Sequence, residues 1–409
     1  MPSLLFLTQR IPYPPTKGEK IRALQILLHL RKSYDVHLGC LVDDPRDIEH
    51  VPTVRALCAA SHFATLNRRR AKITCLRGLL TGEALSAAFY HDRGLAAWVA
   101  RVLREVRPEV VFVSSSNMAP YVLDLASPGS LRVVDLVDVD SEKWQAYADA
   151  GNFPMKHVNR REAARVVALE RRILGECDWS TFVSAEEAAL FDRLQPGHAQ
   201  KIRAISNGVD HAYFDPAGDF AEMYDTSRPN FVFTGTMDYP PNIAAVVWFA
   251  NSVLPVIRET LPDAQFQVVG SSPAPEVRTL AAIPGVFVAG RVPDMRPYLA
   301  YATAAVAPMR IARGIQNKVL EAMAMARPVV VTADALTGIE AEAATEVLVA
   351  ETAEEFAAAC VRAAGPKGAA IGRAARARVL KDYVWAERLR GFDTLLGTAD
   401  QGALLPAVA

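Results

Sequence analysis

The stretch Ala307–Thr332, APMRIARGIQNKVLEAMAMARPVVVT, decides the fold class. Its pattern predicts a strand that ends near Met309 and a helix that starts near Gly314 and runs to about Met325. A second β-rich run follows at once. A strand, a helix and another strand in succession form the repeating unit of a parallel sheet that is covered by helices.

The same alternation extends in both directions from this stretch. Short apolar runs typical of buried strands are separated by segments with helical spacing of apolar residues. These runs begin at Leu4, Val36, Val110, Leu131 and Ser180 in the first half, and at Asn230, Phe266, Val286, Ala304, Arg327 and Glu346 in the second. The two series predict an α/β protein of two doubly wound Rossmann-like domains.

A stretch without sustained periodicity, residues 207–228, separates the two series. We expect an N-terminal domain at 1–208, a linker at 209–228, a C-terminal domain at 229–383 and a terminal helix at 384–400 that returns to the first domain. Ligands of open α/β sheets bind outside the carboxyl ends of the strands. Two such domains facing each other would therefore form one cleft.

Composition narrows the class of protein. The chain has 409 residues, of which 51% are hydrophobic and 22% are charged, so it can bury full cores. Lys plus Arg and Asp plus Glu both number 45, so the net charge is zero. Overall charge thus gives no argument for a nucleic acid or a membrane as partner.

The expected compartment is the cytoplasm. The five cysteines are scattered and odd in number, which favours reduced thiols over a disulfide frame. The first residues, MPSLLFLTQR, resemble a first strand more than a signal peptide. We find no uncharged apolar run near the ~18 residues that span a bilayer.

The start of the helix near Gly314 carries unusual charges. Arg310 and Arg313 precede it, and Lys318 lies in its first turns. Cations at a helix N-terminus are unfavourable by ~0.3–1 kcal/mol each. Their presence makes sense if an anion lies among them, and Gly314 would let that anion approach the backbone amides. A diphosphate is the natural candidate.

Glu321 follows Lys318 by three residues, so both side chains reach neighbouring surface. A carboxylate at this place can accept two hydroxyl groups at once, as on a ribose. The alternative is a solvated Lys–Glu pair on an exposed helix. The order of the two residues and their apolar neighbours favour the ligand interpretation.

A similar arrangement follows the first strand. Gly18 lies at the predicted start of a helix, with Lys17, Lys20 and Arg22 around it. Two interpretations are equally supported by the sequence: a loop that closes over phosphate and sugar, or an ordinary solvent-facing connection.

Several motifs, taken together, resemble the family 4 (group 1) glycosyltransferases of the GT-B fold. KVLEAMAMARPVVVT resembles their EAMAxGxPVV signature, and AISNGVDHAYFDP resembles their interdomain link. PYPPTKGEKIR, DLVDVDSEKW and RIARGIQNKVLEAMAM look closest to the sugar transferases of PEP-CTERM/exosortase exopolysaccharide loci. The resemblance covers most of the chain and is strongest from Asn207 to Val331.

The resemblance implies a hexosyltransferase that moves a sugar from a nucleotide-diphosphate sugar to an acceptor hydroxyl. It implies retention at the anomeric carbon, no metal and no cofactor, and a saccharide or lipid-linked saccharide acceptor. With the residues argued above, the expected donor-binding set is Gly18, Gly235, Thr236, Arg291, Val292, Arg313, Gly314, Ile315, Gln316, Lys318 and Glu321. Lys318 and Glu321 would also serve catalysis.

The chain departs from the family pattern at several positions. Arg313 stands where the family often has Glu, and Ala326 replaces a usual Gly. The Lys expected early in the donor domain is replaced near Asn242. The usual first-domain His is missing, and Asp138 or Asp140 occupies its region. Asp138 would orient the acceptor or act as a weak base, or it would simply cap the next helix.

Asp138 and Asp140 also spell D-x-D, a metal-binding motif in another transferase fold. The predicted two-domain architecture argues against that role here. Two other functions share the fold: a nucleotide-sugar 2-epimerase, and a non-catalytic protein that binds a nucleotide sugar. The missing His and the Arg313 change are compatible with the second of these, whereas the absence of GxGxxG argues against a dehydrogenase.

One basic run stands out, formed by Arg68, Arg69, Arg70 and Lys72 and followed by a mildly amphipathic segment. It suggests contact with anionic lipid at the inner face of the cell membrane. A solvated loop followed by a core helix explains the same pattern equally well.

Overall fold

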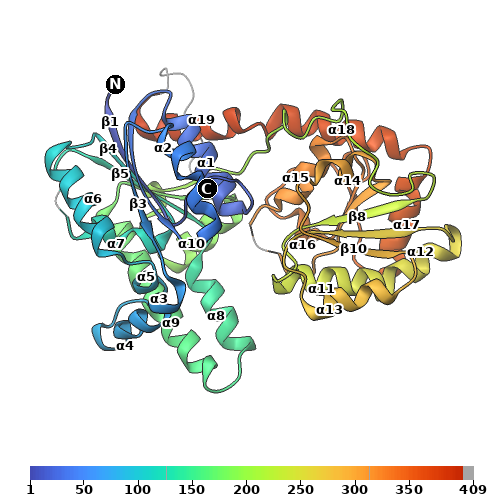
Figure 1. Cartoon of the computed structure of the whole chain (residues 1–409), viewed down its shortest axis with the longest axis horizontal. Coiled ribbons are helices and arrows are strands. Elements are labelled where there is room, and N and C mark those ends of the chain that lie inside the picture. Colours follow the sequence, from blue (N-terminus) through green and yellow to red (C-terminus); the bar gives the residue numbers. More distant parts are fainter. Residues whose placement is uncertain (126, 313, 399–409) are drawn as a thin grey trace. The chain divides into compact units, whose positions relative to one another are not determined.

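The computed structural model describes residues 1–125, 127–312 and 314–398, which form two compact units. The first unit comprises Met1–Ser206 together with the chain from Leu389 onward, and the second comprises Asn207–Arg388. Residues 209–228, expected as a linker, therefore group with the second unit. The two units are shown in Figure 1 and are described separately.

A seven-stranded parallel sheet forms the centre of the first unit, in the order β3-β2-β1-β4-β5-β6-β7. Its strands are β1 (Ser3–Thr8), β2 (Asp35–Val42), β3 (Ala60–Thr65), β4 (Val110–Ser114), β5 (Leu131–Val137), β6 (Trp179–Phe182) and β7 (Ile202–Ala204).

The helices of this unit connect the strands. They are α1 (Gly18–Leu30), α2 (Val51–Arg55), α3 (Arg68–Thr74), α4 (Gly78–Thr81), α5 (Leu85–Phe89), α6 (Arg93–Glu105), α7 (Pro120–Leu123), α8 (Asp140–Ala150), α9 (Met155–Glu176) and α10 (Ala185–Leu194). Short 3-10 turns are η1 (Pro45–His50), η2 (Cys75–Arg77), η3 (Ser116–Met118) and η4 (Ala199–Lys201). The end of α19 (Trp385–Leu396) completes the unit, where Phe392 packs edge-on against Phe112 of β4.

The central strands form because their side chains are apolar on both faces. All five residues of β4 are buried, as expected for a strand covered by helices on both sides. The two edge strands, β3 and β7, lack a strong apolar run and were not predicted. The four residues Ala60–Phe63 of β3 are only half-buried, because an edge strand needs less apolar surface.

The second unit contains a six-stranded parallel sheet in the order β10-β9-β8-β11-β12-β13. Its strands are β8 (Asn230–Thr234), β9 (Gln265–Val269), β10 (Val286–Gly290), β11 (Ala304–Ala307), β12 (Val329–Val331) and β13 (Leu348–Val349). Each of the six runs predicted in this half overlaps one of them.

The helices of the second unit are α11 (Pro240–Trp248), α12 (Leu254–Thr260), α13 (Pro275–Thr279), α14 (Arg296–Ala300), α15 (Asn317–Ala324), α16 (Ala333–Leu336), α17 (Ala353–Ala364) and α18 (Gly368–Asp382). A π turn, η5 (Phe249–Val253), joins α11 to α12, and a 3-10 turn, η6 (Leu280–Ala282), follows α13.

The run Pro240–Thr260 is long and apolar enough by composition to cross a membrane, contrary to our expectation from the sequence. Its residues Val246, Phe249 and Leu254 are fully buried against the sheet. We therefore interpret this helix as part of the core.

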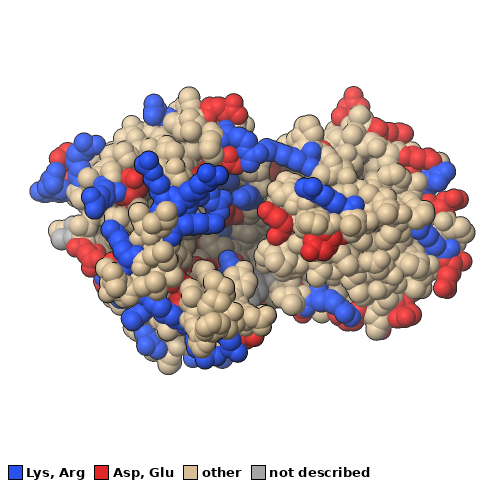
Figure 2. Space-filling view, turned by 60° about the horizontal axis from the view of Figure 1, so that its bottom comes forward, with Lys and Arg blue, Asp and Glu red and all other residues tan. Residues whose placement is uncertain are grey.

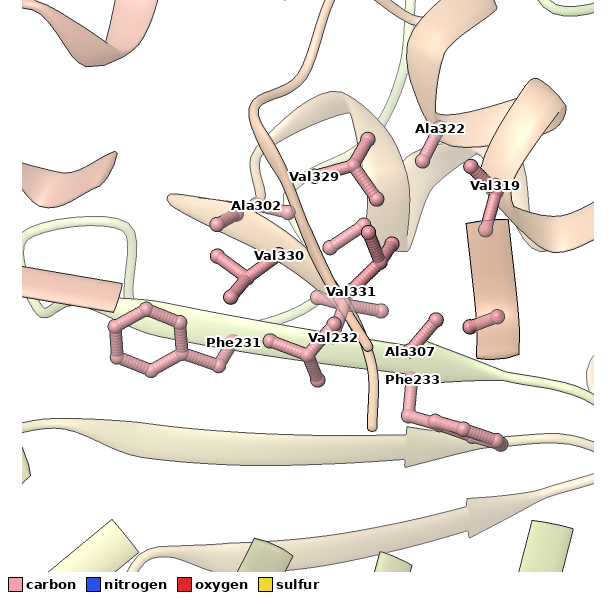
Figure 3. Close-up of a cluster of buried hydrophobic side chains, with 14 of the residues drawn as sticks. Phe231, Val232, Phe233, Ala302, Ala307, Val319, Ala322, Val329, Val330 and Val331 are labelled. Atoms are coloured by element: carbon pink, nitrogen blue, oxygen red, sulfur yellow. The ribbon is translucent and has the colours of Figure 1, made fainter. Parts of the chain in front are cut away.

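The core of the second unit fixes the position of α15. Figure 3 shows Val319 and Ala322 of this helix next to the β-strand side chains Val329 and Val331. Both helix residues are fully buried. Burial of this apolar face anchors the helix and determines where its polar residues lie.

Strand order reverses at one place in each sheet. β1 lies between β2 and β4 in the first unit, and β8 lies between β9 and β11 in the second. At such a point the connections leave the sheet on opposite sides, and the carboxyl ends of the two strands flank a crevice. We therefore look for a binding site at the carboxyl ends of β1 and β4 in the first unit and of β8 and β11 in the second.

Candidate functional site

Two glycine turns form the edge of the second sheet beside the reversal point. Gly235 follows β8 and donates its backbone N–H to the Val269 carbonyl oxygen over 3.0 Å. A Cβ atom on Gly270 would lie only 1.5 Å from the Gly235 carbonyl oxygen. Glycine at position 270 is therefore required for the two turns to pack this closely.

Helix α15 begins at Asn317, three residues later than predicted. The reason is local: Gly314 has a left-handed φ of 60°, and Gln316 is extended with φ −82° and ψ 95°. Gly314, Ile315 and Gln316 thus belong to the loop between β11 and α15. The N-cap residue Gln316 makes no side-chain capping hydrogen bond, so the first amides of the helix receive no cap from it.

Lys318, in the first turn of α15, extends over the end of β8. Its Nζ atom donates to the Asn242 Oδ1 atom over 2.7 Å and lies 4.4 Å from the centre of the Phe233 ring. A Cβ atom on Gly235 would lie 3.4 Å from the same Nζ atom. The predicted Gly235 and Lys318 are therefore neighbours, although they are 83 positions apart in the sequence.

The surroundings of Lys318 disfavour its charge. Burial lowers the pKa of Lys318 to about 7, and the nearby Glu321 carboxyl opposes this change. Its hydrogen-bond partner Asn242 is a neutral amide. A cation placed among neutral groups at a strand-reversal point would be stabilised by an incoming anion.

Glu321 lies one turn further along the helix. Burial raises its pKa to about 7, and Lys318 opposes the rise. Both side chains are half-buried, and the helix packs through Val319 and Ala322. The alternative of a solvated ion pair on an exposed helix is therefore wrong.

The other cations predicted at this helix behave differently. Arg310 is exposed, and its guanidinium lies 5.1 Å from the centre of the Trp248 ring. The prediction for Arg313 falls outside the described residues. Of the three cations, Lys318 thus lies beside the Gly235 turn, and Arg310 makes a cation–π contact with Trp248.

The remaining predicted donor residues lie along the same edge. The Thr236 carbonyl oxygen accepts a hydrogen bond of 2.8 Å from Asn242 Nδ2. Arg291 is exposed and Val292 is half-buried, both directly after β10. Since β10 is two strands from β8, these two residues lie about 10 Å from the Gly235 turn.

Two asparagines outside the predicted set of site residues connect this edge, and one of them, Asn242, lies where the family's Lys is replaced. Asn242 holds both Lys318 and the Thr236 turn. Asn207 donates from Nδ2 to Asn317 Oδ1, over 3.2 Å, at the start of α15. The NGVD motif contains Asn207, but the sequence indicated only a connecting role for it.

A hollow of about 240 Å³ lies where the expected linker packs on the second unit. Arg296 lines it, stacked 3.9 Å from the centre of the Tyr213 ring and paired with Asp294. Burial raises the pKa of Tyr213, and the charges of Asp294 and Glu321 contribute. The hollow is thus within electrostatic reach of Glu321.

In the first unit, the cations around Gly18 are mostly engaged. Lys20 is buried and pairs with Asp47 at 3.0 Å, and Arg22 is buried and pairs with Asp135 at 2.7 Å. Lys20 and Arg22 are therefore already paired with carboxylates inside the unit, and closure of the loop over phosphate and sugar stays a prediction. Gly18 itself is exposed at the start of α1.

Asp138 follows β5 and has an unusual environment. Its Oδ1 atom is buried without a hydrogen-bond partner among the described residues. Burial raises the pKa of Asp138 to about 7, and the nearby Glu187 and Asp140 raise it further. The carboxyl group can therefore both accept and release a proton near neutral pH.

Asp138 does not cap the following helix. The N-cap of α8 is Val139, whose N–H donates to Glu187 Oε2 over 2.8 Å. Glu170 Oε1 accepts from the Ser141 N–H over 3.1 Å. Glu170 of α9 and Glu187 of α10 thus cap the helix, and the Asp138 carboxyl group is not used for capping.

The D-x-D motif does not form a cluster. Asp140 accepts a hydrogen bond of 2.6 Å from the Ser116 hydroxyl, and the part of the chain that the structure describes has no group of three metal-ligating side chains. Val137 and Ser115 take left-handed φ angles of 73° and 85° at the ends of β5 and β4. Such strain in non-glycine residues is common beside functional sites.

Two doubly wound parallel α/β units, the second with a cation and glycine turns at its reversal point, define the GT-B architecture. Residues 228–365 match the protein family described as "Glycosyl transferases group 1". The matched residues lie within the second unit. The chain matches none of the curated protein sequences.

Solved structures resemble the whole chain. HepE from Anabaena, solved with UDP and glucose, is 14% identical with a TM-score of 0.67, and the match covers 98% of this chain and 100% of HepE. Sucrose-phosphate synthase from Thermosynechococcus elongatus is 18% identical, with a TM-score of 0.67 and coverage of 97% and 100%. WaaG, a glycosyltransferase involved in lipopolysaccharide biosynthesis, is 15% identical, with a TM-score of 0.65 and coverage of 96% and 100%. At these identities the likeness establishes the GT-B fold.

Proposed function

We propose that this protein is a glycosyltransferase that uses a nucleotide-diphosphate sugar as donor. The observation that carries the proposal is the position of Lys318, a cation held by a neutral amide beside Gly235 at the reversal point of the second sheet. The group 1 domain match over residues 228–365 supports the same activity.

The diphosphate would lie between Lys318 and the loop Gly314–Gln316. The first amides of α15 carry partial positive charge and suit an anion at this place. Glu321, one turn further, would accept the two ribose hydroxyls. Arg291 and Val292 would lie beside the base, as the resemblance to the family implies.

The reaction breaks the bond between the anomeric carbon and the diphosphate oxygen, which leaves with the electron pair. A bond to the acceptor oxygen forms, and the acceptor hydroxyl loses its proton. Lys318 and the helix amides would stabilise the departing diphosphate without a metal, and preorganised charge of this kind is usually the largest catalytic effect. We propose retention at the anomeric carbon.

Asp138 would hold the acceptor hydroxyl or receive its proton. Support comes from its buried, unpartnered Oδ1 atom and from its pKa of about 7. A carboxyl group with a pKa near the working pH is efficient in this role. This assignment places a carboxylate where the family usually has histidine.

We further propose a hexosyl donor, a saccharide or lipid-linked saccharide acceptor, and a place in exopolysaccharide biosynthesis of the PEP-CTERM/exosortase type, in the cytoplasm. HepE was solved with UDP-glucose, and WaaG is involved in lipopolysaccharide biosynthesis. Both observations concern those proteins, and the first of them makes UDP-sugars the first donors to test.

The test is a panel of UDP- and GDP-sugars scored by thermal shift. A donor at about 100 times its dissociation constant should stabilise the protein by ~2.7 kcal/mol. Glu321→Ala should abolish this shift, whereas Glu354→Ala, at an exposed position of α17, should retain it. Normal donor binding by Glu321→Ala would refute the site.

Product analysis separates the activities. A glycosyltransferase releases nucleoside diphosphate in proportion to a new glycoside, and an epimerase converts the donor without an acceptor. Binding of a donor with neither product would indicate a non-catalytic protein.

A further inference from the structure

The segment 68–81 of the first unit, RRRAKITCLRGLLT, is a surface feature that sugar transfer does not explain. It is a continuous helical run of α3, η2 and α4, and only Ala71 and Gly78 are buried in it. It contains five cations and no acidic residue: Arg68, Arg69, Arg70, Lys72 and Arg77. We call it the basic segment.

The basic segment also exposes large aliphatic side chains. Leu80 is 93% exposed, Ile73 71%, Leu76 51% and Leu79 50%. Residues 73, 76 and 80 recur at helical spacing and share one face of the run. Single exposed leucines are ordinary, but four such side chains within eight residues mark a contact surface.

The end of the basic segment is hydrogen-bonded to α9 in the folded structure. Its exposed leucines are therefore part of the folded surface. Arg161 donates to the carbonyl oxygens of Gly78 and Glu83. The Glu162 carboxylate accepts from the backbone N–H groups of Leu85 and Ser86 at 2.8 and 2.7 Å. These bonds attach the end of the basic segment, at Gly78, and the residues that follow it to α9, while the aliphatic side chains of the segment stay exposed.

The position of the segment within its unit favours docking. In Figure 1, α3 and α4 lie at the same end of the first unit as the turn between α8 and α9, where Phe153 and Met155 are also exposed. Figure 2 shows Lys and Arg side chains gathered over the face of this unit that it brings forward, with uncharged surface between them.

We propose that the basic segment docks on an anionic lipid bilayer, with Ile73, Leu76, Leu79 and Leu80 inserted at the interface. Cations flanking exposed aliphatic side chains on a helix are the combination that anionic interfaces bind. A nucleic acid would be attracted by the cations and would leave the leucines in water. The proposal is independent of the donor site in the second unit.

Vesicle flotation with the full chain tests the proposal. Vesicles of phosphatidylglycerol and phosphatidylcholine should bind the protein, and phosphatidylcholine vesicles should bind it far less. Each cation near an anionic surface contributes about fivefold, so Arg69→Gln, Arg70→Gln and Lys72→Gln together should weaken binding on the order of 100-fold. High salt should weaken binding in the same direction.

Matched variants distinguish docking through the basic segment from non-specific attraction by the protein's total positive charge. Arg31→Gln, Lys32→Gln and Arg104→Gln, which remove three exposed cations elsewhere in the unit, should bind vesicles like the parent. Leu79→Ser with Leu80→Ser should lose vesicle binding while its melting temperature and the UDP-sugar thermal shift stay unchanged.

Three outcomes would overturn the proposal: no difference between the two vesicle types, parental vesicle binding by the leucine variant, or self-association instead. In the last case, light scattering without vesicles would show a dimer that the leucine variant abolishes. None of these outcomes would affect the donor site, which the thermal shift reports separately.

Discussion

Burial brings the pKa of both Lys318 and Glu321 to about 7, from opposite directions. Burial removes the proton from the lysine and retains it on the glutamate, and each group opposes the effect on the other. A bound diphosphate would favour the charged lysine. Binding then takes up a proton above pH 7, and affinity should fall as the pH rises further.

We predict this pH dependence for UDP binding by calorimetry. Between pH 7 and pH 9 the parent should lose up to about tenfold in affinity for each pH unit, because Lys318 must be protonated on binding. Lys318→Met should bind at least about tenfold more weakly at pH 7 and lose the slope. Lys381→Met, at an exposed position of α18, should keep both the affinity and the slope. An unchanged slope in Lys318→Met would refute the assignment.

Asp138 should make stability depend on pH. Its folded pKa of about 7 lies above the ordinary value of 3.8, so the folded state holds a proton that the unfolded chain releases. Stability from this group is therefore present at low pH and is lost as the pH rises toward and past 7. We expect Asp138→Asn to gain about 4 kcal/mol relative to the parent between pH 4 and pH 8 in urea unfolding, with most of the gain below pH 7. Asp149→Asn, at an exposed position of α8, should show no such gain, and a pH-independent effect of Asp138→Asn would contradict the argument.

At the scale of elements, the site depends on how closely the strand ends approach each other. The turns after β8 and β9 meet at Gly235 and Gly270, and α15 brings Lys318 onto the first of them. The apolar face of α15 supplies the burial that keeps this geometry. The same burial lowers the pKa of Lys318.

Gly270→Ala should destabilise the second unit by about 3 kcal/mol and weaken UDP binding. The new Cβ atom would meet the Gly235 carbonyl oxygen at 1.5 Å, so the turn that faces Lys318 must move. Gly175→Ala provides the control, because a Cβ atom there, in helix α9, meets nothing within 4 Å. This change should be neutral or stabilising by up to about 1 kcal/mol. Denaturant unfolding would contradict the prediction if both variants resemble the parent.

At the scale of the whole molecule, the two units have separate cores and separate sheets. The donor residues that the structure brings together belong to the second unit, whereas Asp138 and Gly18 belong to the first. Whether Gly18 contributes to donor binding stays a prediction.

Hydrogen exchange tests the division of roles. UDP should increase amide protection at the turn after β8, at 290–292 and at 314–321, because these backbone groups would become bonded or covered. The central strands of the first unit should exchange as before. If Gly18 contacts the sugar, a UDP-sugar should additionally protect residues 9–18, and UDP alone should not. Protection confined to the first unit on adding UDP would contradict the site.

The sequence predicted much of this protein because its signals are local. The central strands β8, β9, β11 and β12 are buried along their whole length and are therefore mostly apolar, so their runs were visible without a structure. The cations before α15 indicated an anion because a helix dipole disfavours them locally. Edge strands β3 and β7 lacked such a signal, since half of their surface needs no apolar residue.

Only the tertiary structure decided which charges are available. Lys20, Arg22 and Lys318 look alike in the sequence, yet the first two meet carboxylates across the fold and Lys318 meets the amide of Asn242. The capping of α8 by Glu170 and Glu187 is equally non-local, and among the described residues Asp138 Oδ1 has no hydrogen-bond partner. The charge state and reach of a side chain depend on neighbours that are distant in the chain, and no local pattern records them.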